Sequence, residues 1–249
     1  MGSEVVREYR RRLKKFKSKY EAKIRRERNI IISTLLHDIK TPILAHIQSI
    51  ELFLRGCFGR VKSTQAPTIE EILKSHYFLL EVINDLAFLL RIENRDYALE
   101  FETGEIVEEI KNSIALLKDV LKEKELKLKT QGFKKRAEIK MDKKITKKVI
   151  KNIVSASVAL AKEKSEIEVD FKESKIGLYF FAKVQTSFIT QERLNSLFDK
   201  NNSSQQDFNQ LGMSFNLNFI KRLIEAQNWE LIANSSKDKI VTLGFLIKK

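Results

Sequence analysis

The residues most able to do chemistry lie near one histidine. His37 is followed directly by Asp38, and Thr41 and Pro42 come shortly afterwards. A neutral imidazole is a good nucleophile near pH 7. An adjacent carboxylate can hold the proton on one ring nitrogen, which leaves the other nitrogen free to attack an electrophile such as phosphorus. The segment therefore predicts a nucleophilic histidine, with Asp38 as its orienting general base.

The elements that would position this histidine are two long helices. Between residues 4 and 55 the only strong helix breaker is Pro42, so we expect one long helix with a kink at that proline. Thr41 would then share a helical face with His37. A second helix is expected from Pro67 to about Leu90. Both helices carry apolar residues at heptad spacing, which predicts an antiparallel hairpin that forms a four-helix bundle in a homodimer.

The first 28 residues are strongly basic. Residues 7–28 hold twelve lysine and arginine residues against three glutamates, in a chain whose net charge is +14. Apolar residues recur at steps of three and four through the same segment: Val6, Tyr9, Leu13, Phe16, Tyr20 and Ile24. This spacing is typical of a coiled coil with charged outer faces. We interpret residues 1–28 as a basic coiled-coil stem; the alternatives are a stem lying near anionic lipid and a nucleic-acid binder.

After Ile92 the pattern becomes that of an α+β domain. Residues 99–102 alternate like a strand, and the two strands around Ser174–Gly177 predict a β-hairpin. The remaining strands are expected at residues 126–129, 137–141, 167–172, 178–185, 229–233 and 240–247, and the helices at residues 106–121, 144–161, 191–198 and 214–227. The fold class is therefore α+β, with a helical hairpin followed by an α/β sandwich.

The segment His37-Asp38-Ile39-Lys40-Thr41-Pro42 matches the pattern H-[DE]-x-[KR]-T-P at every defined position. It resembles the phosphoacceptor box of two-component sensor histidine kinases, and the elements after residue 96 resemble the GHKL-type ATP-binding domain of that family. The resemblance implies that His37 accepts the phosphoryl group, that Thr41 positions the water of a phosphatase reaction, and that Pro42 loosens the helix beside them. It also implies a dimerisation and phosphoacceptor domain at residues 29–95 and a catalytic, ATP-binding-like domain at residues 96–249.

The nucleotide-binding motifs of this family are incomplete here. The asparagine box N-L-L-x-N-A-x-K keeps Asn152, but Ala156 takes the place of the asparagine that binds Mg²⁺. The box D-x-G-x-G-I begins with Val184, which cannot accept a hydrogen bond from the adenine amino group, and continues through Phe188. The box G-x-G-L-G falls on residues 212–216 and keeps Gly212, one of only eight glycines in the chain. Asn152 and Gly212 are thus remnants of an ATP site.

These observations predict a two-component signal transduction protein that exchanges a phosphoryl group between His37 and a response-regulator aspartate. No cofactor is expected, and its own ATP-dependent autophosphorylation is doubtful, because the contacts to Mg-ATP are missing. One alternative is an active sensor histidine kinase with a divergent nucleotide site, whose cofactors would be ATP and Mg²⁺. Another is a non-catalytic pseudokinase scaffold. The expected partners are a second copy of the chain, a response-regulator receiver domain and an active histidine kinase, without nucleic acid.

Other features of the sequence concern location and the remaining histidines. The single cysteine, Cys57, fits a reducing compartment, and no run of about 18 apolar residues predicts a membrane span. Met1–Ser3 is typical of a cloning remnant. We therefore expect a cytoplasmic protein, or the cytoplasmic portion of a longer sensor. No metal site is predicted: His46 is interpreted as a packing or surface residue and His76 as a core residue of the hairpin.

Overall fold

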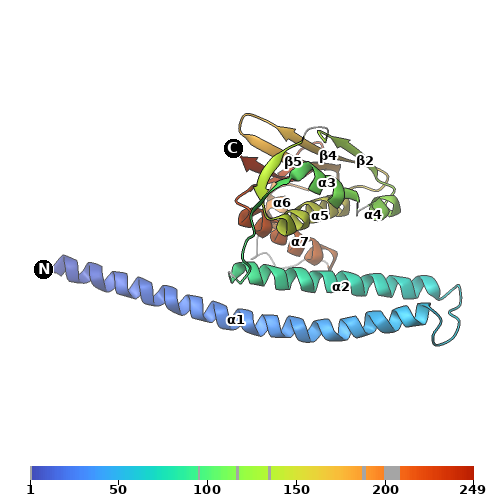
Figure 1. Cartoon of the computed structure of the whole chain (residues 1–249), viewed down its shortest axis with the longest axis horizontal. Coiled ribbons are helices and arrows are strands. Elements are labelled where there is room, and N and C mark those ends of the chain that lie inside the picture. The colour runs from blue at the N-terminus through green and yellow to red at the C-terminus, as the bar shows by residue number, and fades with distance from the viewer. Residues whose placement is uncertain (1, 95, 116–117, 134–135, 187–188, 199–207) are drawn as a thin grey trace. The chain divides into compact units, whose positions relative to one another are not determined.

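The structure, a computed structural model, describes residues 2–94, 96–115, 118–133, 136–186, 189–198 and 208–249. The chain divides into two compact units, Met1–Ala98 and Leu99–Lys249. The first unit consists of two long helices, and the second combines β-strands with helices (Figure 1). The predicted fold class is confirmed: a helical hairpin is followed by an α/β sandwich.

The first unit is the predicted hairpin. Helix α1 (Gly2–Leu54) runs through Pro42 without ending, and α2 (Ala66–Glu93) has Pro67 in its first turn. A proline is tolerated there because the first amides of a helix have no partner within the helix. The connection between the helices turns at Gly56 and Gly59, whose φ angles of +79° and +108° are easily adopted only by glycine.

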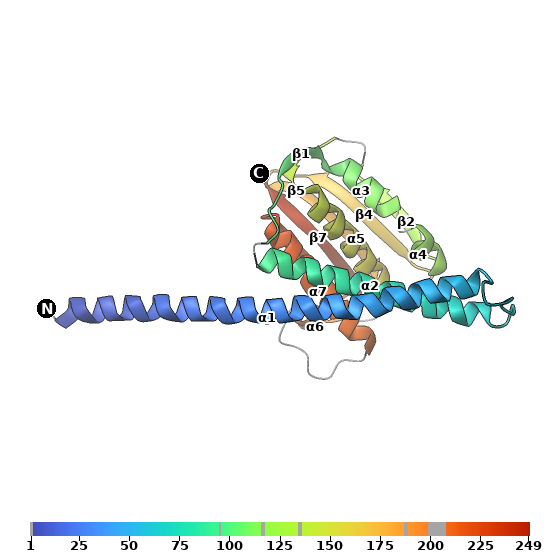
Figure 2. The ribbon, with the colours of Figure 1, turned by 60° about the horizontal axis from the view of Figure 1, so that its bottom comes forward.

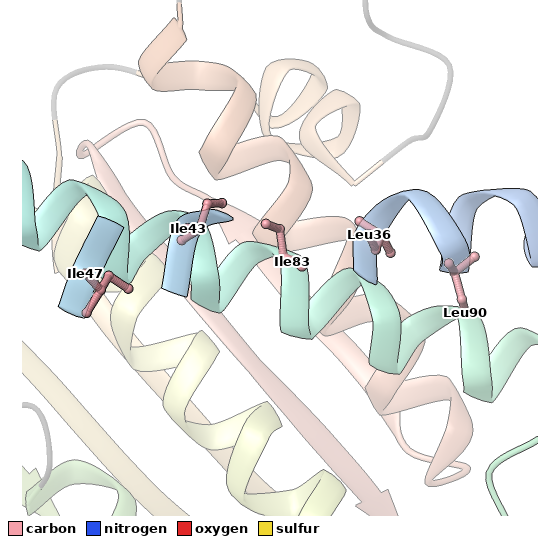
Figure 3. Close-up of a cluster of buried hydrophobic side chains, with 5 residues drawn as sticks. All are labelled: Leu36, Ile43, Ile47, Ile83 and Leu90. Atoms are coloured by element: carbon pink, nitrogen blue, oxygen red, sulfur yellow. The ribbon is translucent and has the colours of Figure 1, made fainter. Parts of the chain in front are cut away.

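A stripe of aliphatic side chains holds the two helices together. Figure 3 shows the buried members of this cluster: Leu36, Ile43 and Ile47 from α1, with Ile83 and Leu90 from α2. Burying one such side chain is worth about 1.5–3 kcal/mol. Beyond this cluster, the buried side chain of Asn29 donates a hydrogen bond to Asn94, the residue that caps the end of α2. The amide pair fixes the register at the open end of the hairpin.

The stem precedes the part of α1 that packs on α2. The six apolar residues of its stripe are exposed, from 48% for Ile24 to 70% for Phe16. Among the described residues, one helix, Val6–Leu54, is long and apolar enough by length and composition alone to cross a membrane. The sequence contains no uninterrupted apolar run long enough to span a membrane, because charged residues such as Asp38 and Lys40 interrupt this helix. The helix is apolar enough only when a few charged residues are allowed within it. Part of its apolar surface packs on α2 instead of facing solvent.

The second unit is built on a five-stranded sheet with the order β2-β4-β5-β7-β6. Its strands are β2 (Lys127–Gln131), β4 (Glu166–Glu173), β5 (Gly177–Gln185), β6 (Glu230–Ser235) and β7 (Ile240–Lys248). β2 is parallel to β4, and the other neighbours are antiparallel. A second, two-stranded sheet joins β1 (Glu102–Glu105) to β3 (Glu138–Met141). The predicted hairpin around Ser174–Gly177 is confirmed.

Helices pack against the large sheet and against one another. They are α3 (Ile106–Ala115), α4 (Lys118–Glu123), α5 (Lys143–Leu160), α6 (Gln191–Leu197) and α7 (Phe208–Ala226). α5 lies on β5 and β7, with α3 and α7 packed against it, and Figure 2 shows α3 and α5 side by side over the sheet. The core between the layers includes Phe180 and Phe245 from the sheet and Phe219 from α7, all fully buried.

Three elements differ from the sequence prediction. The first strand lies at Glu102–Glu105 and not at residues 99–102, because its partner β3 aligns with residues 102–105. The helix expected at residues 106–121 is described as α3 and α4, with residues 116–117 between them outside the described part. Helix α7 begins at Phe208, six residues before the predicted start. Gly212 does not stop the helix, since one internal glycine costs it only about 1 kcal/mol.

Candidate functional site

The reactive histidine predicted from the sequence lies on the outer surface of the hairpin. The side chains of His37 and Asp38 are 80% and 68% exposed, and His37 Nδ1 lies 3.4 Å from Asp38 Oδ1. A carboxylate at Nδ1 favours the tautomer with the proton on that nitrogen and the lone pair on Nε2. Because the ring is exposed, a large phosphoryl donor can approach Nε2 without displacing other side chains.

Thr41 and Pro42 shape the helical turn that follows the histidine. Thr41 Oγ1 donates a hydrogen bond to the carbonyl oxygen of His37 at 3.3 Å, which places the two residues on the same helical face. Pro42 has no amide hydrogen, so the carbonyl of Asp38 receives no helical bond from that position. The turn therefore holds the Thr41 hydroxyl against the backbone of His37 and leaves the Asp38 carbonyl without its usual helical donor.

Lys40 completes the surface around His37, and the sequence did not indicate its role. Its Nζ donates a hydrogen bond to Asn84 Oδ1 of α2 at 3.0 Å. The bond links the turn of α1 that carries His37 to the second helix, α2. In the sequence the two residues lie 44 positions apart, so only the packed hairpin reveals the pair.

In the second unit, Asn152 lies on α5 in the position predicted for the asparagine box. Its side chain is only 5% exposed, and its Nδ2 donates to the carbonyl oxygen of Lys148 in the same helix at 2.9 Å. Ala156, one turn further along α5, is buried as well. The Nδ2 group of Asn152 is thus engaged in its own helix, and the side chain of Ala156 offers no oxygen to a metal ion.

Val184, at the position of the adenine acceptor, is part of the core. It lies in β5 between Ile167 of β4 and Val241 of β7, and it is 2% exposed. The strand ends at Gln185, and Thr186 donates its backbone amide to the carbonyl oxygen of Lys239 at 2.9 Å. Phe188, which the sequence places in the same box, lies outside the described residues.

Gly212 does not occupy a loop, which corrects the expectation from the sequence. The whole box at residues 212–216 lies inside α7. Amides inside a helix donate to carbonyl oxygens four residues earlier, so they cannot also cradle a phosphate group, whereas the free amides of a helix N-terminus can. The four glycines with positive φ lie elsewhere, at Gly56, Gly59, Gly132 and Gly177, where the chain turns.

No protein-family model matches the chain. It is 21% identical over 218 residues to the cell-division control histidine kinase PdhS of Brucella canis, a match that covers 82% of this chain and 21% of PdhS. The chain is therefore a homologue of the sensor histidine kinases. The chain spans about a fifth of the length of PdhS.

Solved structures show that the fold of this histidine kinase homologue is that of the family. Full-length ShkA in complex with AMPPNP superposes with a TM-score of 0.65 at 15% identity, covering 88% of this chain and 46% of that one. The Acinetobacter baumannii histidine kinase AdeS gives a TM-score of 0.58 at 13% identity, covering 85% and 97%. The ThkA catalytic domain, with a TM-score of 0.51 at 13% identity, covers 60% of this chain and 97% of its own.

The histidine kinase homologue also carries contacts that the sequence did not reveal. His46 and His76, from different helices of the hairpin, lie against each other with ring centroids 5.4 Å apart. In the second unit, buried Gln227 accepts a hydrogen bond from the amide of Asp142 and donates to the Asp142 carbonyl oxygen and to Thr146 Oγ1. Neither contact follows from a local pattern, since His46 and His76 lie 30 positions apart and Gln227 lies 81 and 85 positions after its partners.

Proposed function

We propose that this histidine kinase homologue is a two-component phosphotransfer protein that carries a phosphoryl group on His37. The observation that carries the proposal is the exposed imidazole with its Nδ1 next to Asp38. The partner is the receiver domain of a response regulator, which holds the phosphoryl group on an aspartate. In this proposal residues 1–28 form the stem, residues 29–95 the dimerisation and phosphoacceptor domain, and residues 96–249 the ATP-binding-like domain.

The transfer needs no more than an oriented imidazole. The lone pair on His37 Nε2 attacks the phosphorus of the aspartyl phosphate, the bond between phosphorus and the aspartate oxygen breaks, and the carboxylate leaves. Asp38 stabilises the positive charge that develops on the ring while Nδ1 keeps its proton. The reverse reaction passes the phosphoryl group to another receiver. Thr41 would orient water in a phosphatase reaction of the regulator, because its hydroxyl lies one turn from His37.

We do not expect the second unit to bind Mg-ATP. Three features argue against it: Ala156 offers no ligand to Mg²⁺, Val184 is buried in the sheet and cannot accept from adenine, and the amides of residues 212–216 are used within α7. Each lost contact to a nucleotide costs about 1–3 kcal/mol. Every ~1.4 kcal/mol lowers the affinity tenfold, so three such losses weaken binding by a factor on the order of 10²–10⁶. The phosphoryl group would therefore come from an active histidine kinase or from a phosphorylated regulator.

An active autokinase is the second candidate. The observation in its favour is the overall similarity to ShkA, whose structure contains AMPPNP. In that case ATP and Mg²⁺ would bind in the second unit and His37 would receive the γ-phosphoryl group. A scaffold without any phosphotransfer is the third candidate; it would use the same surfaces but leave His37 unmodified.

The homodimer and the location belong to the proposal as well. Leu35, Ile39 and Phe53 of α1 and Ile72 and Leu79 of α2 are apolar and between 45% and 53% exposed, which is costly in water. A second copy would cover these side chains in a four-helix bundle. The stem, whose apolar stripe is exposed too, would continue the dimer as a coiled coil, and its basic residues would lie near anionic lipid if a membrane is close. We assign the protein to the cytoplasm.

Two measurements separate the three candidates. The full chain is first incubated with Mg²⁺ and ATP labelled at the γ-phosphate. Acid-labile label that appears in the wild-type chain and is absent from His37→Gln would establish the autokinase and contradict the proposal; we expect none. A thermal-shift titration with Mg-ATP should likewise leave the unfolding temperature of the second unit unchanged.

In the second measurement, the chain is mixed with a receiver domain that has been phosphorylated with acetyl phosphate labelled at its phosphoryl group. We expect the label to move to His37, and Asp38→Asn to slow the transfer about 10²-fold, the usual contribution of one acid–base group. If the label stays on the receiver in both the wild type and His37→Gln, the scaffold is the correct candidate. Accelerated loss of the receiver phosphate that Thr41→Ala abolishes would add the phosphatase reaction.

A further inference from the structure

His46 of α1 and His76 of α2 form a pair across the hairpin. Their ring centroids are 5.4 Å apart and the ring planes are at 77°. They are two of only three histidines in the chain. His46 is exposed and His76 is half-buried, so both rings can be reached from solvent in the single chain. The pair lies apart from the reactive turn, since His46 follows His37 by nine residues.

The backbone sets the tautomer of His76. Its Nδ1 lies 2.8 Å from the carbonyl oxygen of Ile72, one turn earlier in α2. A carbonyl oxygen only accepts hydrogen bonds, so Nδ1 carries the proton and donates it. In the neutral ring the lone pair is then on Nε2. Histidines that bind metal ions show this arrangement almost always: one nitrogen is held by an outer hydrogen bond, and the other is the ligand.

The spacing of the two rings also suits a shared ion. A nitrogen ligand lies about 2.1 Å from Zn²⁺, and two imidazoles on one tetrahedral ion then have centroids about 5 Å apart. The observed separation of 5.4 Å is close to this value. Binding would require the rings to turn from their edge-to-face arrangement, so that both free nitrogens aim at one point.

We propose that His46 and His76 bind a borderline-soft divalent cation such as Zn²⁺, which links α1 to α2. Imidazole ligands suit Zn²⁺, Ni²⁺ and Cu²⁺ better than Mg²⁺ or Ca²⁺. Within the described residues no group of three or more histidine, cysteine, aspartate or glutamate side chains could hold a metal ion, so one chain supplies only these two imidazole ligands. The remaining positions of the ion are therefore filled by water or by the same pair of a second copy. The site does not depend on phosphotransfer by His37.

The test titrates the metal-free full chain with ZnCl₂ in a calorimeter at pH 7.5. We expect saturable binding that falls at least tenfold in His46→Gln and in His76→Gln. His37→Gln removes the third histidine and Cys57→Ser removes the only thiol, and both serve as controls for Zn²⁺ binding alone. One ion per chain, or one ion per two chains, supports the site with water or with the second copy as the completing ligand.

A second readout is the nitrogen chemical shift of the histidine rings in the wild type. Zn²⁺ should shift Nε2 of His76 and leave its Nδ1 proton in place. The proposal is overturned if the wild type binds no Zn²⁺, if His76→Gln binds as tightly as the wild type, or if binding is lost in His37→Gln or Cys57→Ser.

Discussion

The residues at the predicted motif positions are mostly exposed in the hairpin, whereas Asn152, Ala156 and Val184 are buried in the α/β unit. In the hairpin, His37 and Asp38 are mostly exposed and close enough to interact. In the α/β unit, Asn152 is buried and bonds to its own helix, and Val184 is a core residue of the sheet. The second unit has a buried apolar core, and neither Ala156 nor Val184 offers a polar side chain there. Fold and chemistry can therefore separate, because buried apolar contacts stabilise the sandwich whether or not a ligand binds.

The largest effect that this contrast predicts is the loss of phosphoryl transfer in His37→Gln. The substitution removes the nucleophile, so acceptance from a phosphorylated receiver domain should fall by more than about 10⁴-fold, the upper end of what one acid–base group contributes. The ring is exposed, so helicity and thermal unfolding should stay as in the wild type. Gln48→Ala, an exposed change on the same helix, is the control and should transfer normally. Transfer at the wild-type rate in His37→Gln would show that the hairpin histidine is not the acceptor.

The second prediction tests whether the two units are energetically separate. Phe180 is fully buried and lies 5.2 Å from the ring of Phe245, which stacks on Trp229. Phe180→Ala should lower the free energy of unfolding of the α/β unit by about 3–5 kcal/mol. Trp229 is the only tryptophan in the chain, so its fluorescence in urea reports on this unit alone.

In the same variant the hairpin should keep its function. Transfer of the phosphoryl group to His37 should proceed at the wild-type rate under conditions where Trp229 shows the second unit to be unfolded. The control is Ile47→Ala, which leaves a cavity in the aliphatic cluster of the hairpin. It should destabilise the two helices without changing the urea midpoint of the Trp229 fluorescence transition. If Phe180→Ala abolishes phosphoryl transfer, the hairpin depends on the sandwich and the contrast fails.

The third prediction concerns the buried polar network of the second unit. Gln227 receives the amide of Asp142 at 3.1 Å, and its Nε2 donates to Asp142 O at 2.8 Å and to Thr146 Oγ1 at 2.7 Å. Gln227→Ala leaves the amide of Asp142 without this acceptor in a buried place, which should cost about 1–3 kcal/mol. The Trp229 transition in urea measures the loss. The control is Glu163→Ala, an exposed change in the same unit, and equal losses in both variants would contradict the importance of the network.

The sequence predicted the elements that depend on local periodicity and failed where distant contacts decide. Heptad spacing identified both helices of the hairpin, and the motif around His37 identified the candidate site. The start of α7 could not be predicted, because the family pattern suggests a loop around Gly212 while the chain contains no second breaker before Ala226. The pairing of His46 with His76 depends on how α1 packs on α2, and it cannot be read from a spacing of 30 residues.

The smallest predicted effect comes from an exposed polar contact of the hairpin. Tyr77 of α2 donates a hydrogen bond to Glu51 Oε1 of α1 at 2.6 Å. This bond, together with partial burial and the negative charge of Glu51, raises the pKa of Tyr77 above its usual value, and Arg55 opposes the rise. A raised pKa in the folded state means that the bond contributes fully below the pKa of the unfolded chain, about 10, and is lost as the pH rises through the folded pKa.

Tyr77→Phe should cost little at pH 8, where the exposed bond is intact, and the variant should lose less stability than the wild type between pH 8 and a pH above the unfolded value of about 10. Helicity at 222 nm, followed during thermal unfolding at both ends of this range, measures the difference between the two proteins. Comparing the wild type with the variant cancels the titration of lysines, which occurs in both. A loss at pH 8 larger than that of Gln227→Ala would reverse the contrast between the units, because an exposed bond of the hairpin would then outweigh a buried one of the sandwich.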